Sequence, residues 1–197
     1  RRRMSPVQTR TRPLPIESGI WVVVFGELSV FTLFFSVFLY YRALSPDLFQ
    51  ASSATLSQGL GALNTIILLT SSWFVASAVS ALQQVSGRER ALRYFVCAFM
   101  CGAAFVLVKI FEYGSALGDG VNVLTDEFFM FYFMLTGIHL MHLLVGMILL
   151  GATALHLRGA LATGSTTSDT LVGFSSCFWH MLDIVWIVLF PLLYLLQ

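Results

Sequence analysis

The chain has 197 residues, of which 57% are hydrophobic and 11% charged, with a formal net charge of +1. Soluble domains carry about 25% charged residues, and the mean hydropathy here is +0.83, which excludes an ordinary soluble domain. The apolar runs are continuous and lack the alternation of lipid-facing strands, and nothing in the sequence suggests nucleic acid binding. We therefore expect an all-α protein that crosses a membrane several times.

The first 18 residues are a basic segment that contains prolines and precedes the first apolar run. That run is too long for the apolar region of a signal peptide, so we expect it to be retained as a membrane span. We interpret residues 1–18 as a cytoplasmic tail and residues 19–197 as a single transmembrane domain.

Five apolar segments are long enough to cross a bilayer, which requires about 20 apolar residues in a helix. We expect spans at residues 19–41, 60–85, 91–113, 128–154 and 170–196. Residues 42–59 are expected to form a polar loop. The second span is rich in small and hydroxyl residues, which let helices approach closely, and this predicts a central position for it. Pro191 is expected to kink the last span without breaking it.

The distribution of basic residues predicts the orientation. Most of the 11 arginines and lysines lie in the tail, between the second and third spans, or between the fourth and fifth. Arg42 and Lys109 lie toward the other side. Because short cytoplasmic loops are enriched in basic residues, we expect a cytoplasmic N-terminus and a periplasmic C-terminus in a bacterial inner membrane.

Several ionisable residues interrupt the spans. Such groups cost at least about 2.5 kcal/mol at the bilayer centre, so they usually face protein or mark a function. They are Glu27, Lys109, Glu112, His139, His142, His180 and Asp183.

The spacing of these residues suggests pairs. Lys109 and Glu112 lie at i,i+3 and can pair near the outer face. Glu27 is a candidate proton-related carboxyl, and a candidate buried polar network is formed by His139, His142, His180 and Asp183. At 1.5 Å per residue, Glu27 and His142 can share a layer with the last span's His180. Such a network can simply fix helix packing, or it can handle protons or hold a lipid or quinone headgroup. Glu27 is expected to be protonated or paired.

A bound redox metal is not expected in this chain. His142 and His180 are the one pair that two facing helices could offer to a heme, but their spans lack the small residues that a porphyrin needs on both sides. A histidine-only copper site needs a third ligand, and His156 lies at the edge of the membrane. Cys97 and Cys101 are too few for a metal site, and the cysteines do not indicate a disulfide framework.

Five segments, in order, resemble subunit III of the heme-copper oxidases, the cytochrome c oxidase subunit III family. The resemblance covers nearly everything from residue 19 to 195. The segments are GIWVVVFGELSVFTLFF with Glu27, ALNTIILLTSS with Leu63, Asn64 and Thr65, KIFEYGSAL with Glu112 and Tyr113, TGIHLMHLLVG with Thr136, Gly137, His139, His142 and Gly146, and FWHMLDIVWIVLF with Trp179, His180, Asp183 and Trp186.

The resemblance implies an accessory subunit that has no redox centre of its own. Its partner would be the catalytic subunit I of an oxidase or nitric oxide reductase, which carries heme with copper or non-heme iron. The chain would then belong to an oxidoreductase complex without being catalytic itself, supporting proton uptake and protecting subunit I during turnover. Glu27 would be the membrane carboxyl of the family, which reacts with hydrophobic carbodiimides.

The sequence departs from the longer family members in two ways. It has five expected spans where full-length members have seven, and the missing pair forms one wall of the cleft that holds phospholipids, although membrane lipids are still expected as partners. Residues 128–146 resemble more closely the subunit-III-like protein associated with nitric oxide reductases. Two other functions stay open. One is a small membrane cytochrome or quinol-handling enzyme using His142 and His180, and the other is a proton or solute carrier using Glu27 with the layer of His142, His180 and Asp183.

Overall fold

The computed structural model describes residues 18–84, 87–163 and 168–196. Within these residues the chain forms six α-helices and a C-terminal π-helical turn: α1 (Ser18–Leu44), α2 (Pro46–Ser53), α3 (Gln58–Leu82), α4 (Arg88–Gly118), α5 (Glu127–Thr163), α6 (Asp169–Phe190) and η1 (Pro191–Leu195). Five of the described segments, α1, α3, α4, α5 and α6 with η1, are long and apolar enough to cross a membrane. The prediction of an all-α, multi-pass membrane protein with five spans is confirmed.

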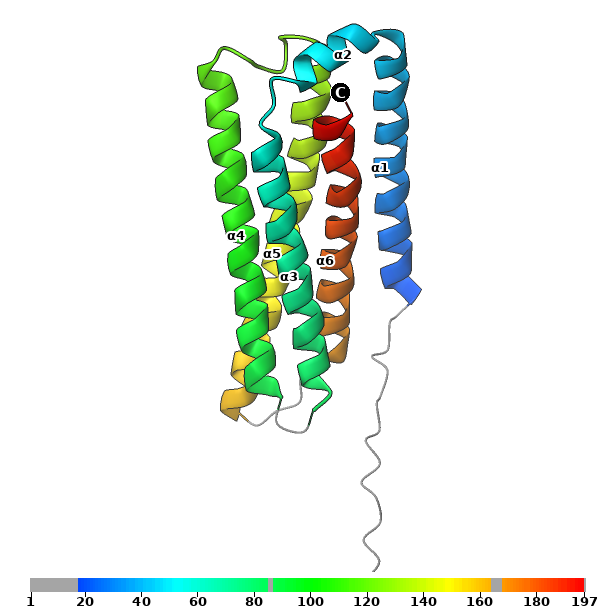
Figure 1. Cartoon of the computed structure of the whole chain (residues 1–197). Helices are drawn as coiled ribbons and strands as arrows, with labels where there is room; N and C mark the ends of the chain where they lie inside the picture. The colour runs from blue at the N-terminus through cyan, green and yellow to red at the C-terminus, as the bar shows by residue number, and fades with distance from the viewer. Residues whose placement is uncertain (1–17, 85–86, 164–167, 197) are drawn as a thin grey trace, which may run out of the picture.

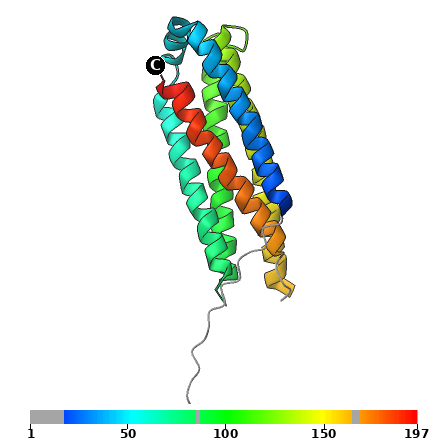
Figure 2. The same cartoon turned by 90° about the vertical axis from the view of Figure 1, so that its right-hand side faces the viewer.

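Four of the spans form a bundle, and the fifth lies outside it. Both α3 and α5 pack against α4 and α6 (Figure 1). The first span, α1, packs mainly against α6 with a smaller contact to α5, and lies on the outside of the bundle (Figure 2). The most buried span is α6, not α3, so the prediction of a central second span is wrong. The bulky Trp179 and Trp186 of α6 fill the interior, and the small residues of α3 let α4 and α6 pack against it.

Local sequence signals set several helix starts. The hydroxyl of Ser57 accepts from the backbone N–H of Leu60, and Ser168 does the same at the start of α6. Pro46 occupies the first turn of α2, where its missing N–H costs nothing. The expected polar loop at residues 42–59 therefore contains a short helix, which buries Phe49 against α5.

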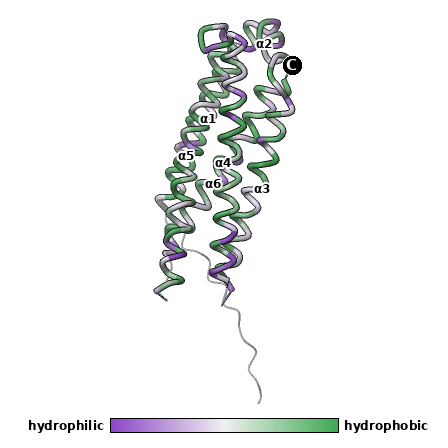
Figure 3. Tube along the Cα trace, turned by 90° about the vertical axis from the view of Figure 1, so that its left-hand side faces the viewer, coloured by the Kyte–Doolittle hydropathy of each residue, from purple (hydrophilic) through white to green (hydrophobic). Residues whose placement is uncertain are grey.

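The described helices extend beyond the expected spans. The third span is α4, which ends at Gly118, and the fourth span is α5, which ends at Thr163. The apolar runs predicted that these spans end at residues 113 and 154. Hydropathy marks the part of a helix that crosses the bilayer, and polar turns can continue it outside. Figure 3 shows the hydrophilic segments gathered mainly at the two ends of the bundle.

The chain continues past Pro191 as a π-helical turn. Proline lacks the N–H that an α-helix needs in its interior, and the N–H of Leu196 donates to the Pro191 carbonyl at 3.0 Å. This wider turn buries Leu193 and Tyr194. Pro191 thus changes the helical pitch and directs the end of the chain into the bundle.

Candidate functional site

Lys109 and Glu112 of α4 form a buried ion pair, with side chains that are 1% and 6% exposed. The Lys109 Nζ lies 3.1 Å from Glu112 Oε2. This is the contact that their i,i+3 spacing predicts. Because a buried charge is costly without a partner, each group keeps the other in the apolar interior.

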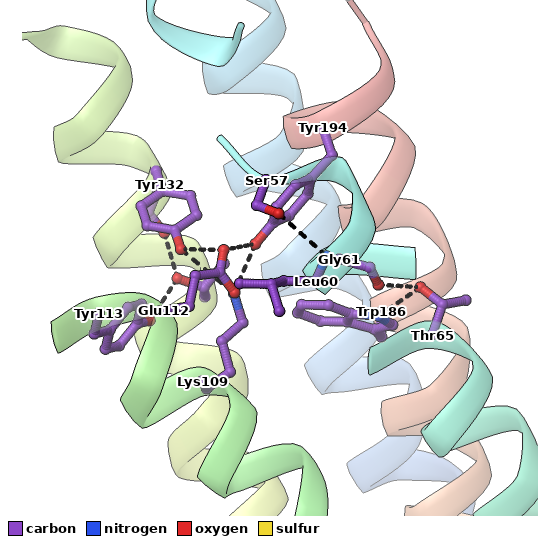
Figure 4. Close-up of polar contacts among 11 residues, drawn as sticks. Ser57, Leu60, Gly61, Thr65, Lys109, Glu112, Tyr113, Tyr132, Trp186 and Tyr194 are labelled. Atoms are coloured by element: carbon purple, nitrogen blue, oxygen red, sulfur yellow. Dashed lines mark hydrogen bonds and ion pairs between the residues drawn. The ribbon is translucent and has the colours of Figure 1, made fainter. Parts of the chain in front are cut away.

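Two tyrosine hydroxyls complete the coordination of this ion pair (Figure 4). Tyr194 donates to Glu112 Oε1 at 2.5 Å, and Tyr132 donates to the same oxygen at 2.7 Å. The ammonium of Lys109 in turn donates to the Tyr194 hydroxyl at 2.7 Å. The pair on α4 is therefore hydrogen-bonded to α5 through Tyr132 and to η1 through Tyr194.

Four aromatic rings surround the ammonium, and we call this set with the ion pair the lysine cage. Nζ lies 5.1–5.6 Å from the ring centroids of Tyr113, Tyr132, Trp186 and Tyr194. A cation within about 6 Å of a ring face is attracted by the quadrupole of that ring. The cage thus surrounds the ammonium with one carboxylate and four ring faces.

Further hydrogen bonds tie the cage to the neighbouring helices. The indole N–H of Trp186 donates to the Thr65 hydroxyl at 3.0 Å, which connects α6 to α3. The Thr136 hydroxyl donates to the Tyr132 carbonyl, so at its 2.6 Å contact with Tyr113 it must accept the phenolic hydrogen. The cage thus joins all four bundle helices.

Glu112 also borders a small cavity of about 100 Å³ beside α3. Its other polar lining includes Ser57 and Ser115, and the exposed Asp119 lies at its outer side. The cavity has space for a few waters, because each water occupies about 30 Å³. The polar residues of this cavity lie between the Glu112 carboxyl and the end of the bundle that carries α2.

Glu27 of α1 meets His142 of α5 at the outside of the bundle. Glu27 Oε2 lies 3.0 Å from His142 Nε2, and the side chains are 32% and 20% exposed, respectively. His142 Nδ1 lies 2.8 Å from the Ile138 carbonyl. A carbonyl only accepts, so Nδ1 carries a hydrogen, and Nε2 either accepts from a protonated Glu27 or donates to its carboxylate. The contact therefore holds a transferable proton.

His180 and Asp183 form the second pair, at the interface of α3 and α6. His180 Nδ1 lies 2.8 Å from the Ser72 hydroxyl and 3.7 Å from Asp183 Oδ2. His180 is half-buried, with 39% of its side chain exposed, and Asp183 is buried. The imidazole therefore covers a buried carboxyl at the surface of the bundle.

His139 is fully buried and stands apart from both pairs. Its ring packs against those of Phe105 and Trp186, and neither of its nitrogens has a hydrogen-bond partner among the described residues. The four residues of the expected polar network are thus found in three separate settings. His139 faces the bundle interior, whereas His142, one turn later, faces Glu27.

The aromatic residues of the cage are not among the site residues that the sequence predicts. Tyr113 was noted for its motif, and Trp186 likewise, but Tyr132 and Tyr194 were not singled out. The available signal was a set of tyrosines near the same membrane face as Lys109. Ser72 was also missed, although it lies in the hydroxyl-rich second span.

The described histidines are not grouped as a metal site. Both ring nitrogens of His142 are engaged, and His156 Nε2 accepts from the backbone N–H of Ser168. Within residues 18–84, 87–163 and 168–196, no three His, Cys, Asp or Glu side chains come together in an arrangement that could hold a metal ion.

Residues 8–197 match the family described as "Cytochrome c oxidase subunit III". The chain is 27% identical over 184 residues to the quinol oxidase subunit 3 of Bacillus subtilis, covering 90% of this chain and 85% of that protein. It is 27% identical over 178 residues to the cytochrome c oxidase subunit 3 of Thermostichus vulcanus, covering 90% and 86%. It is 26% identical over 195 residues to the probable cytochrome c oxidase subunit 3 of Mycobacterium tuberculosis, covering 98% and 94%.

Proposed function

Because the chain belongs to the cytochrome c oxidase subunit III family, we propose that it is an accessory, non-redox subunit of a heme-copper respiratory complex. The family resemblance inferred from the five sequence motifs is confirmed. In the proposed complex, a catalytic subunit I carries the heme, and this chain stabilises it and supports proton uptake. The relatives named above are subunits of quinol or cytochrome c oxidases, which supports an oxidase as the host complex.

The contact between Glu27 and His142 is the observation that carries the proposal. It joins a carboxyl to an imidazole on the outside of the bundle, and both side chains are partly exposed. Ionisable groups in a span usually face other protein or mark a proton pathway. A partly exposed pair that holds a transferable proton is suited to a surface that meets the catalytic subunit.

The distribution of charge supports the predicted orientation. The start of α1 lies at the same end of the bundle as the start of α4 and the end of α5 (Figure 1), where Arg88, Arg90, Arg93 and Arg158 are found. The opposite end carries Asp119, Asp126 and Glu127. By the positive-inside rule, we place the arginine-bearing end in the cytoplasm and the chain in a bacterial inner membrane.

The contacts favour this proposal over a membrane cytochrome. To ligate a heme iron, His142 would have to give up its contact with either Glu27 or Ile138. His180 likewise points its Nδ1 toward Ser72. The specific assignment to the form associated with nitric oxide reductases stays a prediction that rests on residues 128–146.

The proposal is tested by purifying the affinity-tagged chain from its native membrane in mild detergent. Co-purifying chains are identified, and reduced-minus-oxidised spectra are recorded for the complex and for the isolated chain. We expect a subunit I and heme absorbance in the complex, and none in the isolated chain. Heme retained by the isolated chain would overturn the proposal and make His142 and His180 the leading ligand candidates.

A matched pair of variants tests the role of the Glu27 contact. Glu27→Gln should leave the amount of assembled complex unchanged and slow proton uptake by the catalytic subunit during sustained turnover. Glu127→Gln, at the start of α5, is the control and should behave as the unmodified chain. Equal turnover and proton uptake in both variants would remove Glu27 from the proposed function.

A further inference from the structure

A groove of about 360 Å³ runs between α3 and α4 at the arginine-bearing end of the bundle. Its eight described lining residues are Trp73, Ala76, Ser77, Ser80, Ala81, Gln84, Arg90 and Tyr94. It is separate from the lysine cage and from the contact between Glu27 and His142. None of these eight side chains carries a carboxyl, and one carries a positive charge.

The mouth of the groove is lined with hydrogen-bond donors. Arg90 Nη1 lies 3.4 Å from Gln84 Oε1, which holds the guanidinium beside the end of α3. The hydroxyls of Ser77 and Ser80 follow along the α3 side. A guanidinium is well suited to binding phosphate because its planar donors match two phosphate oxygens. The mouth therefore matches a phosphate ester in charge and in hydrogen bonding.

The groove adjoins a shallow apolar hollow on the surface of α3. This second hollow, of about 320 Å³, is lined by Ile66, Leu69, Thr70 and Trp73, so Trp73 borders both. The Trp73 ring is 61% exposed, and its centroid lies 5.2 Å from that of Phe74 and 6.4 Å from that of Tyr94. These rings separate a polar mouth from an apolar floor.

The two hollows together are long enough to hold a lipid of one membrane leaflet. From Gln84 to Ile66 the helix rises about 27 Å, at 1.5 Å per residue. One leaflet with its headgroups is about 20–22 Å thick. Trp73 lies about 16 Å along the helix from Gln84, at the depth of the middle of an acyl chain. An amphiphile with its phosphate at Arg90 would lay its chain past Trp73 toward Ile66.

We propose that this groove is a binding site for an anionic phospholipid of the leaflet that contacts the arginine-bearing end. Arg90 binds the phosphate, Ser77, Ser80 and Gln84 bind its ester and glycerol oxygens, and one acyl chain lies over Trp73 and along α3. The site selects an anionic over a zwitterionic headgroup because no carboxylate among the described lining residues offsets Arg90. This lipid site does not depend on the proposed respiratory function.

Tryptophan quenching tests the site in the full chain reconstituted in nanodiscs of zwitterionic lipid. Trp179 and Trp186 are buried, so Trp21→Phe leaves Trp73 as the exposed tryptophan. Phosphatidylglycerol brominated in the middle of its acyl chains is added at a low mole fraction, and phosphatidylcholine with the same chains is added to a parallel sample. The same chain with Trp73→Phe gives the baseline from the buried rings.

We expect brominated phosphatidylglycerol to quench Trp73 more strongly than brominated phosphatidylcholine. Arg90→Gln should lower this selectivity about five-fold, as the loss of one basic contact predicts. Arg158→Gln is the matched control, since it removes an exposed arginine at the same end of the bundle outside the groove, and it should preserve the selectivity. Equal quenching by the two lipids, or selectivity that survives Arg90→Gln, would overturn the proposal.

Native mass spectrometry of the complex purified from its own membrane separates a lipid from a protein occupant. We expect retained phosphatidylglycerol that is lost with Arg90→Gln and kept with Arg158→Gln. If the groove is instead covered by another subunit, the retained lipid will be identical in both variants while Arg90→Gln weakens that subunit's association. That outcome would overturn the lipid assignment.

Discussion

The hydroxyl of Tyr194 lies 2.7 Å from the ammonium of Lys109, although 85 residues separate them in the chain. The same hydroxyl donates to Glu112, so the turn η1 completes the coordination of a buried ion pair. The π-helical turn that begins at Pro191 places Tyr194 there. The turn η1 is therefore part of the core of the bundle.

Removing one charge of the lysine cage should be far more damaging than removing both. Lys109→Met leaves Glu112 without its cation among buried rings, and breaking a buried pair in this way costs about 3–5 kcal/mol. In the double variant Lys109→Met with Glu112→Gln, the amide oxygen can still accept from Tyr132 and Tyr194, so most of the stability should return. The free energy of unfolding is measured by titration with sodium dodecyl sulfate in mixed micelles. A double variant as unstable as Lys109→Met would show that the cage does not depend on charge balance.

The sequence identifies the partners in the cage only where they are close along the helix. The i,i+3 spacing of Lys109 and Glu112 predicts their contact, because the α-helix fixes that geometry. Tyr132 and Tyr194 reach the pair from other helices, and their positions follow from helix rotation and from the π-helical turn. Neither of these is encoded in hydropathy or in local spacing.

Helix rotation also explains why the two histidines of α5 face different neighbours. His139 and His142 lie at i,i+3, and this spacing predicts that they share one network. A helix turns about 300° over three residues at 3.6 residues per turn, so the two rings diverge by about 60°. On α5 this is enough to direct one ring toward Trp186 and the other toward Glu27. Counting residues from the ends of the spans predicts that Glu27 and His142 lie at the same level of the bundle. It does not predict the direction that each side chain faces.

Glu27 should react with the hydrophobic reagent dicyclohexylcarbodiimide, and Glu112 should not. Both are carboxyls within spans, but Glu27 is 32% exposed at the outer surface of the bundle and Glu112 is 6% exposed inside the lysine cage. Peptide mass spectrometry after labelling in native membranes locates the adduct. Glu27→Gln is the control, and it should abolish the adduct while leaving the fold intact. An adduct on Glu112 would mean that the cage opens to the lipid.

His180→Ala should destabilise the bundle by about 1–3 kcal/mol, because it removes the partner of the buried Asp183 carboxyl. Ser72→Ala is the informative comparison, since it removes the other contact of His180 Nδ1 and leaves the imidazole beside Asp183. We expect Ser72→Ala to cost clearly less. Thermal unfolding in detergent, followed by circular dichroism, measures both variants. Equal losses would indicate that His180 acts through Ser72 alone.

Two glycines of one sequence motif should respond in opposite ways to alanine. A Cβ at Gly146 would lie 2.9 Å from Leu182 Cδ1 and 3.0 Å from the ring of the buried Trp179, whereas a Cβ at Gly137 would meet nothing within 4 Å. Gly146→Ala should therefore cost about 1–3 kcal/mol by overpacking the contact of α5 with α6. Gly137→Ala should be neutral or stabilise by up to about 1 kcal/mol, because alanine favours a helix interior. Unfolding of both variants in the same micelles tests the difference. If Gly146→Ala were as stable as Gly137→Ala, α5 would not approach Trp179 as closely as the structure shows. Close packing would then not explain the glycine at position 146.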